Sequence, residues 1–309
     1  MSSRKRRKQY AIDQCALYNV TTKKGLEEKL LLPPGALKGM LRGVTYRDFQ
    51  IPKKSGSFRQ VSAPNERLKI VQKRILKLLS AVEKPDWVMS GTPGKCHKDN
   101  AIFHVPNAYM ATMDIENFYD RCVRERVYQF FTMKLREPSD VAKALTDLCT
   151  YRQSIPTGAP TSQIVAYFAY ENMFDEINQV AKDCGCIFSL YVDDMTFSSK
   201  APFSPDKLAS EVDVILRKYG HRAKMSKTKY YAKGACKLTT GAAISRDLAL
   251  VAPNDLRKRV LDNYDKLKKT GDKSLIATIL GQIQAAQFIE GRDMFPGIKQ
   301  AVIALSNVS

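Results

Sequence analysis

The sequence predicts an α+β protein in which a mixed β-sheet carries helices on one face and is followed by a basic helical subdomain. Three observations lead to this prediction. Segments rich in β-branched and aromatic residues occur through the middle of the chain, amphipathic helical patterns lie between them, and the pattern is helical from Pro253 onward. A chain of 309 residues can also form two or three subdomains around a shared core.

The composition indicates a globular protein with a polyanionic partner. Lys and Arg outnumber Asp and Glu by 50 to 31, which gives a net charge of +19. From residue 215 to the end the count is 18 against 7, so +11 of this charge lies in the last third. We therefore expect nucleic acid as the partner, ahead of an anionic membrane. Since we find neither an apolar run of transmembrane length nor a signal-peptide core, we expect no membrane association and a cytoplasmic location.

The cysteines and histidines argue against two kinds of metal site. Seven scattered cysteines, an odd number, favour free thiols in a reducing compartment. Cys184 and Cys186 have no second pair elsewhere, and the chain has three histidines. We therefore expect neither a zinc site nor a histidine-based one.

The first half of the chain predicts short elements after a basic cluster. Arg4–Lys8 is typical of a solvated arm, and less often of a nucleic-acid contact. Periodicity then predicts a series of helices and strands that opens with two helices, and Pro33-Pro34 separates these two. The expected helices are Lys24–Leu31, Pro34–Leu41, Leu68–Val82 and Glu125–Leu135, and the expected strands are Tyr46–Ile51, Phe58–Ser62 and Tyr109–Ile115.

The second half predicts a long helix, a hairpin and a helical end. Thr157–Ser162 is turn chemistry that opens one helix to about Lys182, with Thr161 or Ser162 as its N-cap. A hairpin, a helix, two strands and a further helix capped by Asn254 or Asp255 should follow. Their expected ranges are Ile187–Ser199, Pro205–Tyr219, Lys229–Ala232, Lys237–Ile244 and residues 254–270.

Three carboxylates are the candidate chemical groups. Asp193 and Asp194 are adjacent at the tip of the predicted hairpin, where like charges repel each other. A divalent cation such as Mg²⁺ would remove that conflict, although an ordinary Asp-rich turn is the alternative. Asp114 ends a predicted strand, where a simple strand-ending cap is the alternative. If the two strands are neighbours, the three carboxylates can hold two Mg²⁺ ions for in-line phosphoryl transfer.

Five motifs resemble those of the reverse transcriptase family, in the order in which that family carries them. A lone Tyr-x-Asp-Asp would be a weak signal, but ordered motifs across residues 50–230 are a strong one. The resemblance implies a right-hand polymerase with fingers, a palm made of an antiparallel sheet backed by helices, and a C-terminal helical thumb. The fingers motifs are Arg59–Pro64 and Leu68–Leu76, and the palm motifs are Asp114–Tyr119, Pro156–Ser162 and Tyr191–Asp194.

The chain also resembles one bacterial branch of that family. Asn100–His104 matches the Asn-Ala-x-x-His signature of retron enzymes, and Leu238–Gly241 is similar to their Val-Thr-Gly motif with Thr in place of Val. The resemblance implies an RNA-directed DNA polymerase that copies its cognate structured noncoding RNA into RNA-linked single-stranded DNA (msDNA). It also implies antiphage defence with a separate effector protein.

Two alternatives stay open. One is another prokaryotic reverse transcriptase, of the intron-maturase, diversity-generating or abortive-infection kind. The other is a non-catalytic RNA-binding scaffold on a palm fold, which the intact carboxylates argue against. The resemblance divides the chain into a basic arm with N-terminal helices over residues 1–45, fingers and palm over 46–235, and an RNA-binding thumb over 236–309.

The resemblance also implies roles for individual residues. Asp114, Asp193 and Asp194 would be catalytic, and together with Ile115 they would hold Mg²⁺. The dNTP-binding residues would be Arg59 as a clasp on the triphosphate, Tyr119 as a steric gate against the 2′-OH, Gly158 in the turn, and Lys227 near the pyrophosphate. For Tyr119 the alternative is a buried core tyrosine, and for Lys227 a solvated charge.

RNA contacts are expected in two regions. The expected RNA-binding residues are Asn100, His104, Arg257, Lys258, Lys266 and Lys269. For His104 the alternative is a hydrogen-bonded structural histidine.

Two residues depart from the family pattern. Thr157 stands where the family usually has Gln, and Gln163 stands where Pro is common.

Overall fold

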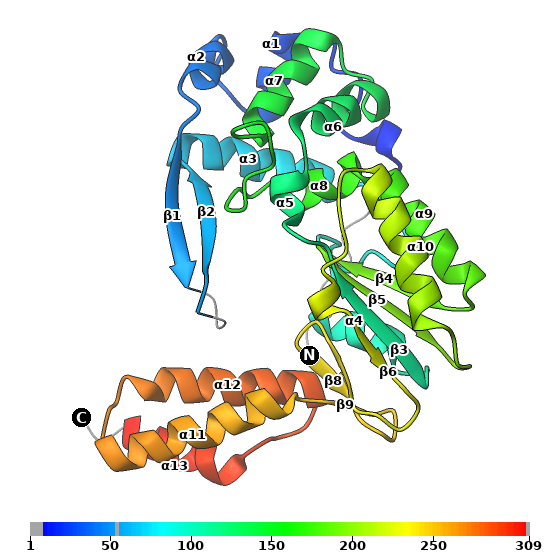
Figure 1. Cartoon of the computed structure of the whole chain (residues 1–309). Coiled ribbons are helices and arrows are strands. Elements are labelled where there is room, and N and C mark those ends of the chain that lie inside the picture. Colours follow the sequence, from blue (N-terminus) through cyan, green and yellow to red (C-terminus); the bar gives the residue numbers. More distant parts are fainter. Residues whose placement is uncertain (1–8, 53–55, 307–309) are drawn as a thin grey trace.

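The chain curves around an open side, with a two-stranded ribbon at one end, a sheet in the middle and three helices at the other end (Figure 1). The computed structural model describes residues 9–52 and 56–306. The basic cluster Arg4–Lys8 therefore lies outside the described residues.

A four-stranded antiparallel sheet forms the middle of the molecule. Its strand order is β4-β5-β3-β6, and each neighbouring pair in it is antiparallel, so the mixed sheet expected from the pattern is corrected. β4 and β5 form the predicted hairpin because they are joined by a short turn. The strands are β3 (Tyr109–Asp114), β4 (Ile187–Tyr191), β5 (Asp194–Ser199) and β6 (Lys229–Tyr231).

Helices cover this sheet and continue into the N-terminal part of the molecule. α9 packs against both β4 and α10, and α4 packs against β4 and β8. The helix expected at Glu125–Leu135 is an α-helix followed by a π-helical turn. These elements are α4 (His97–His104), α5 (Phe118–Arg121), α6 (Arg124–Gln129), η2 (Phe130–Lys134), α7 (Ser139–Cys149), α8 (Ser162–Ala169), α9 (Glu171–Asp183), α10 (Pro205–Lys218) and η3 (Met225–Lys227).

The N-terminal part consists of short helices and a long ribbon. β1 pairs with β2 over seven residues on each strand. α3 begins two residues before the expected Leu68, because the Asn65 side chain caps it by accepting a hydrogen bond from the Leu68 N–H at 2.8 Å. The elements are η1 (Ile12–Gln14), α1 (Lys23–Leu30), α2 (Ala36–Arg42), β1 (Tyr46–Pro52), β2 (Phe58–Pro64) and α3 (Glu66–Leu79).

The C-terminal part is a small sheet followed by three helices. The single strand expected at Lys237–Ile244 is instead a hairpin, since Thr240 and Gly241 both have positive φ and reverse the chain. α11 has Pro253 at its N-cap position without a side-chain cap in the described contacts, so the cap expected from Asn254 or Asp255 is wrong. The elements are β7 (Lys237–Thr239), β8 (Ala242–Ile244), β9 (Leu250–Val251), α11 (Asn254–Thr270), α12 (Leu275–Glu290) and α13 (Pro296–Ser306).

The long helix predicted from Ser162 to Lys182 is broken at Tyr170. The Tyr170 hydroxyl accepts a hydrogen bond from the Val123 N–H at 3.0 Å and donates one to the Arg121 carbonyl at 3.1 Å. This buried side chain therefore connects the break to the loop after α5. The proposed N-cap is also corrected, because Thr161 makes no side-chain cap in the described contacts and the Ser162 hydroxyl donates to the Pro156 carbonyl.

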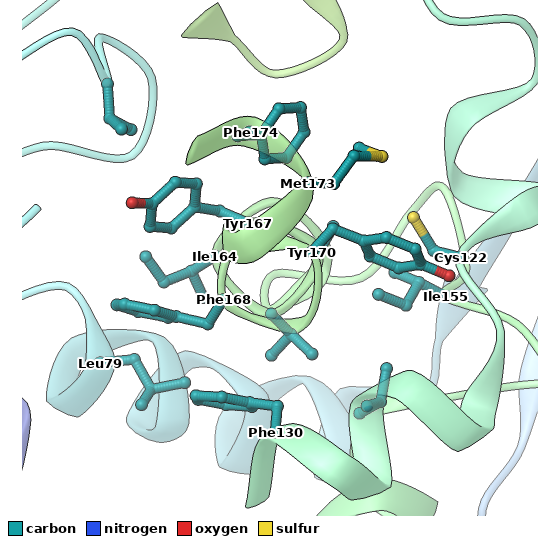
Figure 2. Packing of buried hydrophobic residues seen from close by; sticks show 14 of the residues in the cluster. Leu79, Cys122, Phe130, Ile155, Ile164, Tyr167, Phe168, Tyr170, Met173 and Phe174 are labelled. Atoms are coloured by element: carbon teal, nitrogen blue, oxygen red, sulfur yellow. The ribbon is translucent and has the colours of Figure 1, made fainter. Parts of the chain in front are cut away.

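A group of aromatic side chains packs together with aliphatic ones in the main hydrophobic core (Figure 2). Phe130 and Phe168 stack with ring centroids 5.3 Å apart and planes 5° from parallel. Tyr167, Tyr170 and Phe174 continue this core toward the sheet. The C-terminal helices form a separate core around Val260, Ile279, Ile283 and Val302, which makes that part a distinct packing unit. Among the described helices, none is long and apolar enough to cross a membrane.

One buried histidine makes stability depend on pH. His221 is 1% exposed and packs against Phe118 and Tyr170, and neither ring nitrogen has a hydrogen-bond partner among the described residues. Burial lowers the pKa of His221 to about 4 from its usual 6.5. The unfolded chain therefore binds the proton more readily, so this histidine costs stability as pH falls below the unfolded pKa.

We predict that His221→Leu reduces the acid sensitivity of folding. Between about pH 7 and about pH 4.5, protonation of His221 in the unfolded chain should cost the wild-type protein roughly 2 kcal/mol of unfolding free energy. The variant should not show this part of the loss. Urea denaturation at the two pH values measures the difference. The other groups that titrate in this range are common to both proteins, so equal losses would contradict the prediction.

Candidate active site

The three predicted carboxylates lie together at one end of the sheet. Asp114 at the end of β3 is directly opposite Asp194 at the start of β5, and Asp193 lies in the β4–β5 turn. The Ile115 N–H donates a hydrogen bond to the Asp193 carbonyl at 3.2 Å, which ties the turn to the residue after β3. The local strand pairing therefore brings the carboxylates together, as the sequence predicted.

The electrostatics of these carboxylates are unfavourable without a cation. Burial, followed by the charges of Asp194 and Asp114, raises the pKa of Asp193 to about 6. Burial and the Asp114 charge also raise the pKa of Asp194. Lys227 offsets part of this repulsion, because its ammonium donates a hydrogen bond to Asp114 Oδ2, and that bond raises the pKa of Lys227.

The carboxylates suit a divalent cation by their chemistry. In the described part of the chain, no three His, Cys, Asp or Glu side chains gather closely enough to hold a metal ion as they stand, and one oxygen of Asp114 is bonded to Lys227. However, hard cations bind carboxylate oxygens, and a cation would relieve the repulsion that raises the pKa of Asp193. Asp114, Asp193 and Asp194 therefore supply a fitting set of ligand types.

The turn that carries Asp193 is strained. Val192 has φ of 64°, a region that β-branched residues rarely adopt. Its N–H donates a hydrogen bond to Ser90 Oγ at 2.7 Å. The segment before Ser90 also bonds to β4, since the Leu190 N–H donates to the Trp87 carbonyl at 2.9 Å and the Met89 N–H to the Leu190 carbonyl at 3.0 Å. Ser90 thus supports the strained turn. This role could not be predicted from the sequence, because a serine in a loop rich in Gly, Pro and Lys carries no distinguishing signal.

A cavity of about 710 Å³ lies beside Asp114 and Asp193. Three of the four predicted dNTP-binding residues, Arg59, Tyr119 and Lys227, line it together with Thr157. Arg59 comes from the exposed ribbon, Tyr119 from α5 and Lys227 from η3, so three separate elements form this pocket. Burial raises the pKa of the Tyr119 phenol, which keeps it neutral.

Gly158, the fourth of these residues, lies against the backbone of β2. A Cβ atom at this position would lie 2.7 Å from the Ser62 carbonyl oxygen. Beside it, the Thr157 hydroxyl donates a hydrogen bond to the Gln60 carbonyl at 3.0 Å. The turn at residues 156–162 therefore holds the ribbon that carries Arg59. The shorter Thr157 side chain contacts the ribbon backbone at the position where the family usually has Gln.

A second cavity, of about 560 Å³, lies on the other side of the carboxylates. Asp114, Asp194 and Thr196 belong to its sheet side, while the β7–β8 turn and α11 supply the opposite wall through Thr240 and Arg259, among others. Asp114 and Lys227 border both cavities. The carboxylates thus separate a pocket beside the ribbon from one beside the C-terminal helices.

The expected RNA-binding residues fall into two groups. Lys258, Lys266 and Lys269 are exposed on α11, and Arg257 pairs with Glu290 at the end of α12. Asn100 and His104 are 0% exposed, so the expected RNA contact of these two side chains is corrected to an internal, structural role. The physical reason is that both lie on the face of α4 that packs against the sheet, where serine and threonine hydroxyls bond them.

An antiparallel sheet with three clustered carboxylates, placed between a ribbon and a set of basic helices, defines a template-directed polymerase of the right-hand class. The chain belongs to the reverse transcriptase (RNA-dependent DNA polymerase) family, whose model matches residues 51–273.

Curated relatives of the chain include bacterial retron reverse transcriptases. It is 23% identical over 237 residues to the retron Ec83 reverse transcriptase of Escherichia coli, covering 72% of this chain and 76% of the relative. It is 26% identical over 174 residues to the retron Se72 reverse transcriptase of Salmonella heidelberg, covering 56% of this chain and 46% of the relative. The matched part thus spans about half the length of the Se72 relative. The expected resemblance to the bacterial retron branch is confirmed.

Solved structures confirm the right-hand polymerase fold. Telomerase from Candida albicans, in a complex with a fragment of telomeric RNA, has a TM-score of 0.53 at 11% identity, covering 88% of this chain and 56% of that one. Apo telomerase from Candida tropicalis, truncated from its C-terminal domain, has a TM-score of 0.50 at 16% identity, covering 68% of this chain and 55% of that one.

We predict that Gly158→Ala impairs nucleotide use. The new Cβ would lie 2.7 Å from the Ser62 carbonyl oxygen, so the turn and β2 must move apart, which changes the position of Arg59 relative to the turn. Such a misplacement should lower kcat/KM for nucleotide by about ten- to a hundredfold on a primed RNA template. Gly39→Ala on α2 is the matched control, because a Cβ there would have no neighbour within 4 Å. Unchanged kinetics for Gly158→Ala would contradict this account of the turn.

Proposed function

We propose that the chain is a retron-type, RNA-directed DNA polymerase that extends a primer with dNTPs. The observation that carries the proposal is the convergence of Asp114, Asp193 and Asp194 beside a cavity lined by Arg59 and Tyr119. Basic residues on α11 supply a surface for the phosphates of a template–primer duplex. We assign the N-terminal arm and helices to residues 1–45, fingers and palm to residues 46–235, and the thumb to residues 236–309.

In the proposed reaction, the primer hydroxyl attacks the α-phosphorus of the dNTP and pyrophosphate leaves. Asp114, Asp193 and Asp194, with Ile115 beside them, would hold Mg²⁺, which supplies charge stabilisation for the attacking and leaving oxygens. Arg59 would grip the triphosphate oxygens with its planar guanidinium, and Lys227 would neutralise charge on the departing pyrophosphate. These residues act mainly by positioning and electrostatics.

Tyr119 would select deoxyribonucleotides. Its ring lines the nucleotide cavity, and it packs against Phe118 at a ring-centroid distance of 5.4 Å, which limits its movement. A ring below the sugar would leave no room for a 2′-OH. This role is compatible with the partly buried position of the side chain.

The similarity to retron enzymes supports a particular template. We propose that the enzyme copies its cognate structured noncoding RNA, starts from a 2′-OH of that RNA, and yields msDNA. The exposed Lys258, Lys266 and Lys269 would contact the RNA backbone, which proteins read mainly through shape and phosphates. We also propose service in antiphage defence with a separate effector protein, from the same resemblance, and a cytoplasmic location.

We predict that Asp193→Asn abolishes DNA synthesis while the fold and RNA binding persist. Asn keeps the shape of the side chain but removes the charge, and its burial cost is lower than that of the carboxylate. Primer extension with Mg²⁺ and an RNA-binding titration measure the two effects. Asp140→Asn on α7 is the matched control, because its side chain is 54% exposed and lies neither among the three carboxylates nor on α11. Substantial synthesis by Asp193→Asn would refute the assignment.

We predict that protein purified from its host carries RNA joined to single-stranded DNA. RNase should shorten the bound species and leave DNA joined to a branched, RNase-resistant RNA remnant. DNase should then degrade the DNA part. Gel analysis after each digestion shows the two steps. Free RNA with no linked DNA would favour the scaffold alternative, and linear DNA without a branch would favour another prokaryotic reverse transcriptase.

A further inference from the structure

A chain of buried hydrogen bonds runs through α4, and neither catalysis nor RNA contact uses it. His104 lies between two serines of the palm strands, with Nδ1 2.7 Å from Ser198 Oγ and Nε2 2.7 Å from Ser189 Oγ. Ser189 Oγ donates to Asn100 Oδ1 at 2.6 Å, and Asn107 Nδ2 donates to Ser198 Oγ at 2.8 Å. His104, Asn100 and both serines are 0% exposed.

The donors and acceptors of this chain run in one direction. Ser198 accepts a hydrogen bond from Asn107, and its own hydroxyl proton can go to His104 Nδ1. Ser189 gives its only proton to Asn100, so it accepts one from His104 Nε2–H. His104 is therefore a neutral imidazole, consistent with burial that lowers its pKa to about 3.

The Asn100 end of this series of hydrogen bonds reaches the C-terminal part of the molecule. Asn100 Nδ2 donates to Thr240 Oγ1 at 3.0 Å and lies 3.3 Å from Thr239 Oγ1, in the β7–β8 hairpin. The Thr239 hydroxyl is also 2.9 Å from the Thr196 hydroxyl on β5, two residues after Asp194. The hairpin that begins the proposed thumb is thus bonded both to α4 and to the strand that carries a carboxylate.

Thr240 has an unfavourable backbone conformation that these bonds offset. Thr239 pairs with Ala242, so Thr240 and Gly241 are the central residues of a two-residue hairpin, with φ of 43° and 82°. Asn-Gly is the usual choice for such a turn, and a β-branched residue there is strained. The Thr240 hydroxyl accepts from Asn100 and donates to the His97 carbonyl at 3.3 Å, so the first turn of α4 holds it.

α4 also makes contacts with the C-terminal helices. Ala101 belongs to an apolar cluster with Ala242, Leu256, Ala286 and Ile289. Lys98 Nζ donates to the Phe288 carbonyl near the end of α12 at 2.6 Å. α4 is therefore bonded both to the palm and to the proposed thumb, and Figure 1 shows it between the sheet and the C-terminal part.

We propose that Asn100 and Thr240 are positioning residues that set the thumb against the catalytic strand, and thereby the grip on the template–primer duplex. The inference rests on the proposed polymerase function. The β7–β8 turn forms the wall of the second cavity that faces Asp114 and Asp194. A shift of this turn would move α11, with its exposed lysines, relative to the carboxylates. Loss of the Thr240 hydroxyl leaves the buried Asn100 donor without that partner, which loosens the joint.

The test compares variants of Thr240 in binding a labelled DNA primer annealed to an RNA template, measured by fluorescence anisotropy. Thr240→Val keeps the shape and removes the hydroxyl, so its Kd should rise about tenfold, while Thr240→Ser should stay within about twofold of the wild type. Thr240→Gly relieves the strained φ but also lacks the hydroxyl. It should therefore unfold at no lower temperature than Thr240→Val and still bind about tenfold more weakly.

Single-turnover extension over a range of duplex concentrations gives an independent measure of the grip. The duplex concentration at half-maximal rate should rise about tenfold for Thr240→Val and Thr240→Gly and stay within about twofold for Thr240→Ser. Equal Kd values for Thr240→Val and Thr240→Ser would overturn the proposal, and so would a slower saturating rate with unchanged Kd. If the wild type binds the duplex but makes no DNA, the polymerase proposal fails while the Kd comparison still decides the role of the joint.

Discussion

The antiparallel pairing of β3 with β5 is the constraint on which the rest of the site depends. This register sets Asp114 opposite Asp194, and like charges at opposed positions destabilise a sheet. The surrounding structure compensates for that conflict. Lys227 bonds to Asp114, and Ser90 supports the strained Val192 beside Asp193. A fold selected for stability alone would have no reason to keep these groups together, and this conflict supports the proposed role of the carboxylates in holding a cation.

The molecule uses two kinds of contact to relate its parts to this register. The Thr157–Gly158 turn holds the ribbon through close backbone packing and one hydrogen bond, so the ribbon side of the site depends on the absence of a side chain at Gly158. The C-terminal side depends on polar bonds instead, because the separate core around Val260 and Ile283 does not itself contact the carboxylates. Alongside these bonds, Ala101 of α4 packs in a small apolar cluster with Leu256 of α11 and Ala286 of α12.

The sequence predicted the parts of the structure that local chemistry decides. Alternating apolar residues and the adjacent Asp193 and Asp194 indicated the hairpin, and the strand ending at Asp114 was also predicted. Elements decided by distant contacts were not. The break at Tyr170 depends on hydrogen bonds to residues almost fifty positions earlier, and the burial of Asn100 and His104 depends on strands about ninety positions later. Polar residues in a motif suggested an exposed contact, and only the tertiary structure supplies their internal partners.

The direction of the hydrogen-bond chain through His104 restricts how this family member can change over time. The side chains of Ser198, His104 and Ser189 each accept one hydrogen bond and donate another. A replacement of the right size but without these groups therefore leaves a buried donor or acceptor without a partner on the neighbouring residue. Asn100, Ser189 and His104 are therefore expected to tolerate coordinated exchanges better than single ones, because their effects on stability do not add. Substitutions in the short signature on α4 are therefore expected to be coupled to substitutions of its hydrogen-bond partners on β4, β5 and the β7–β8 turn.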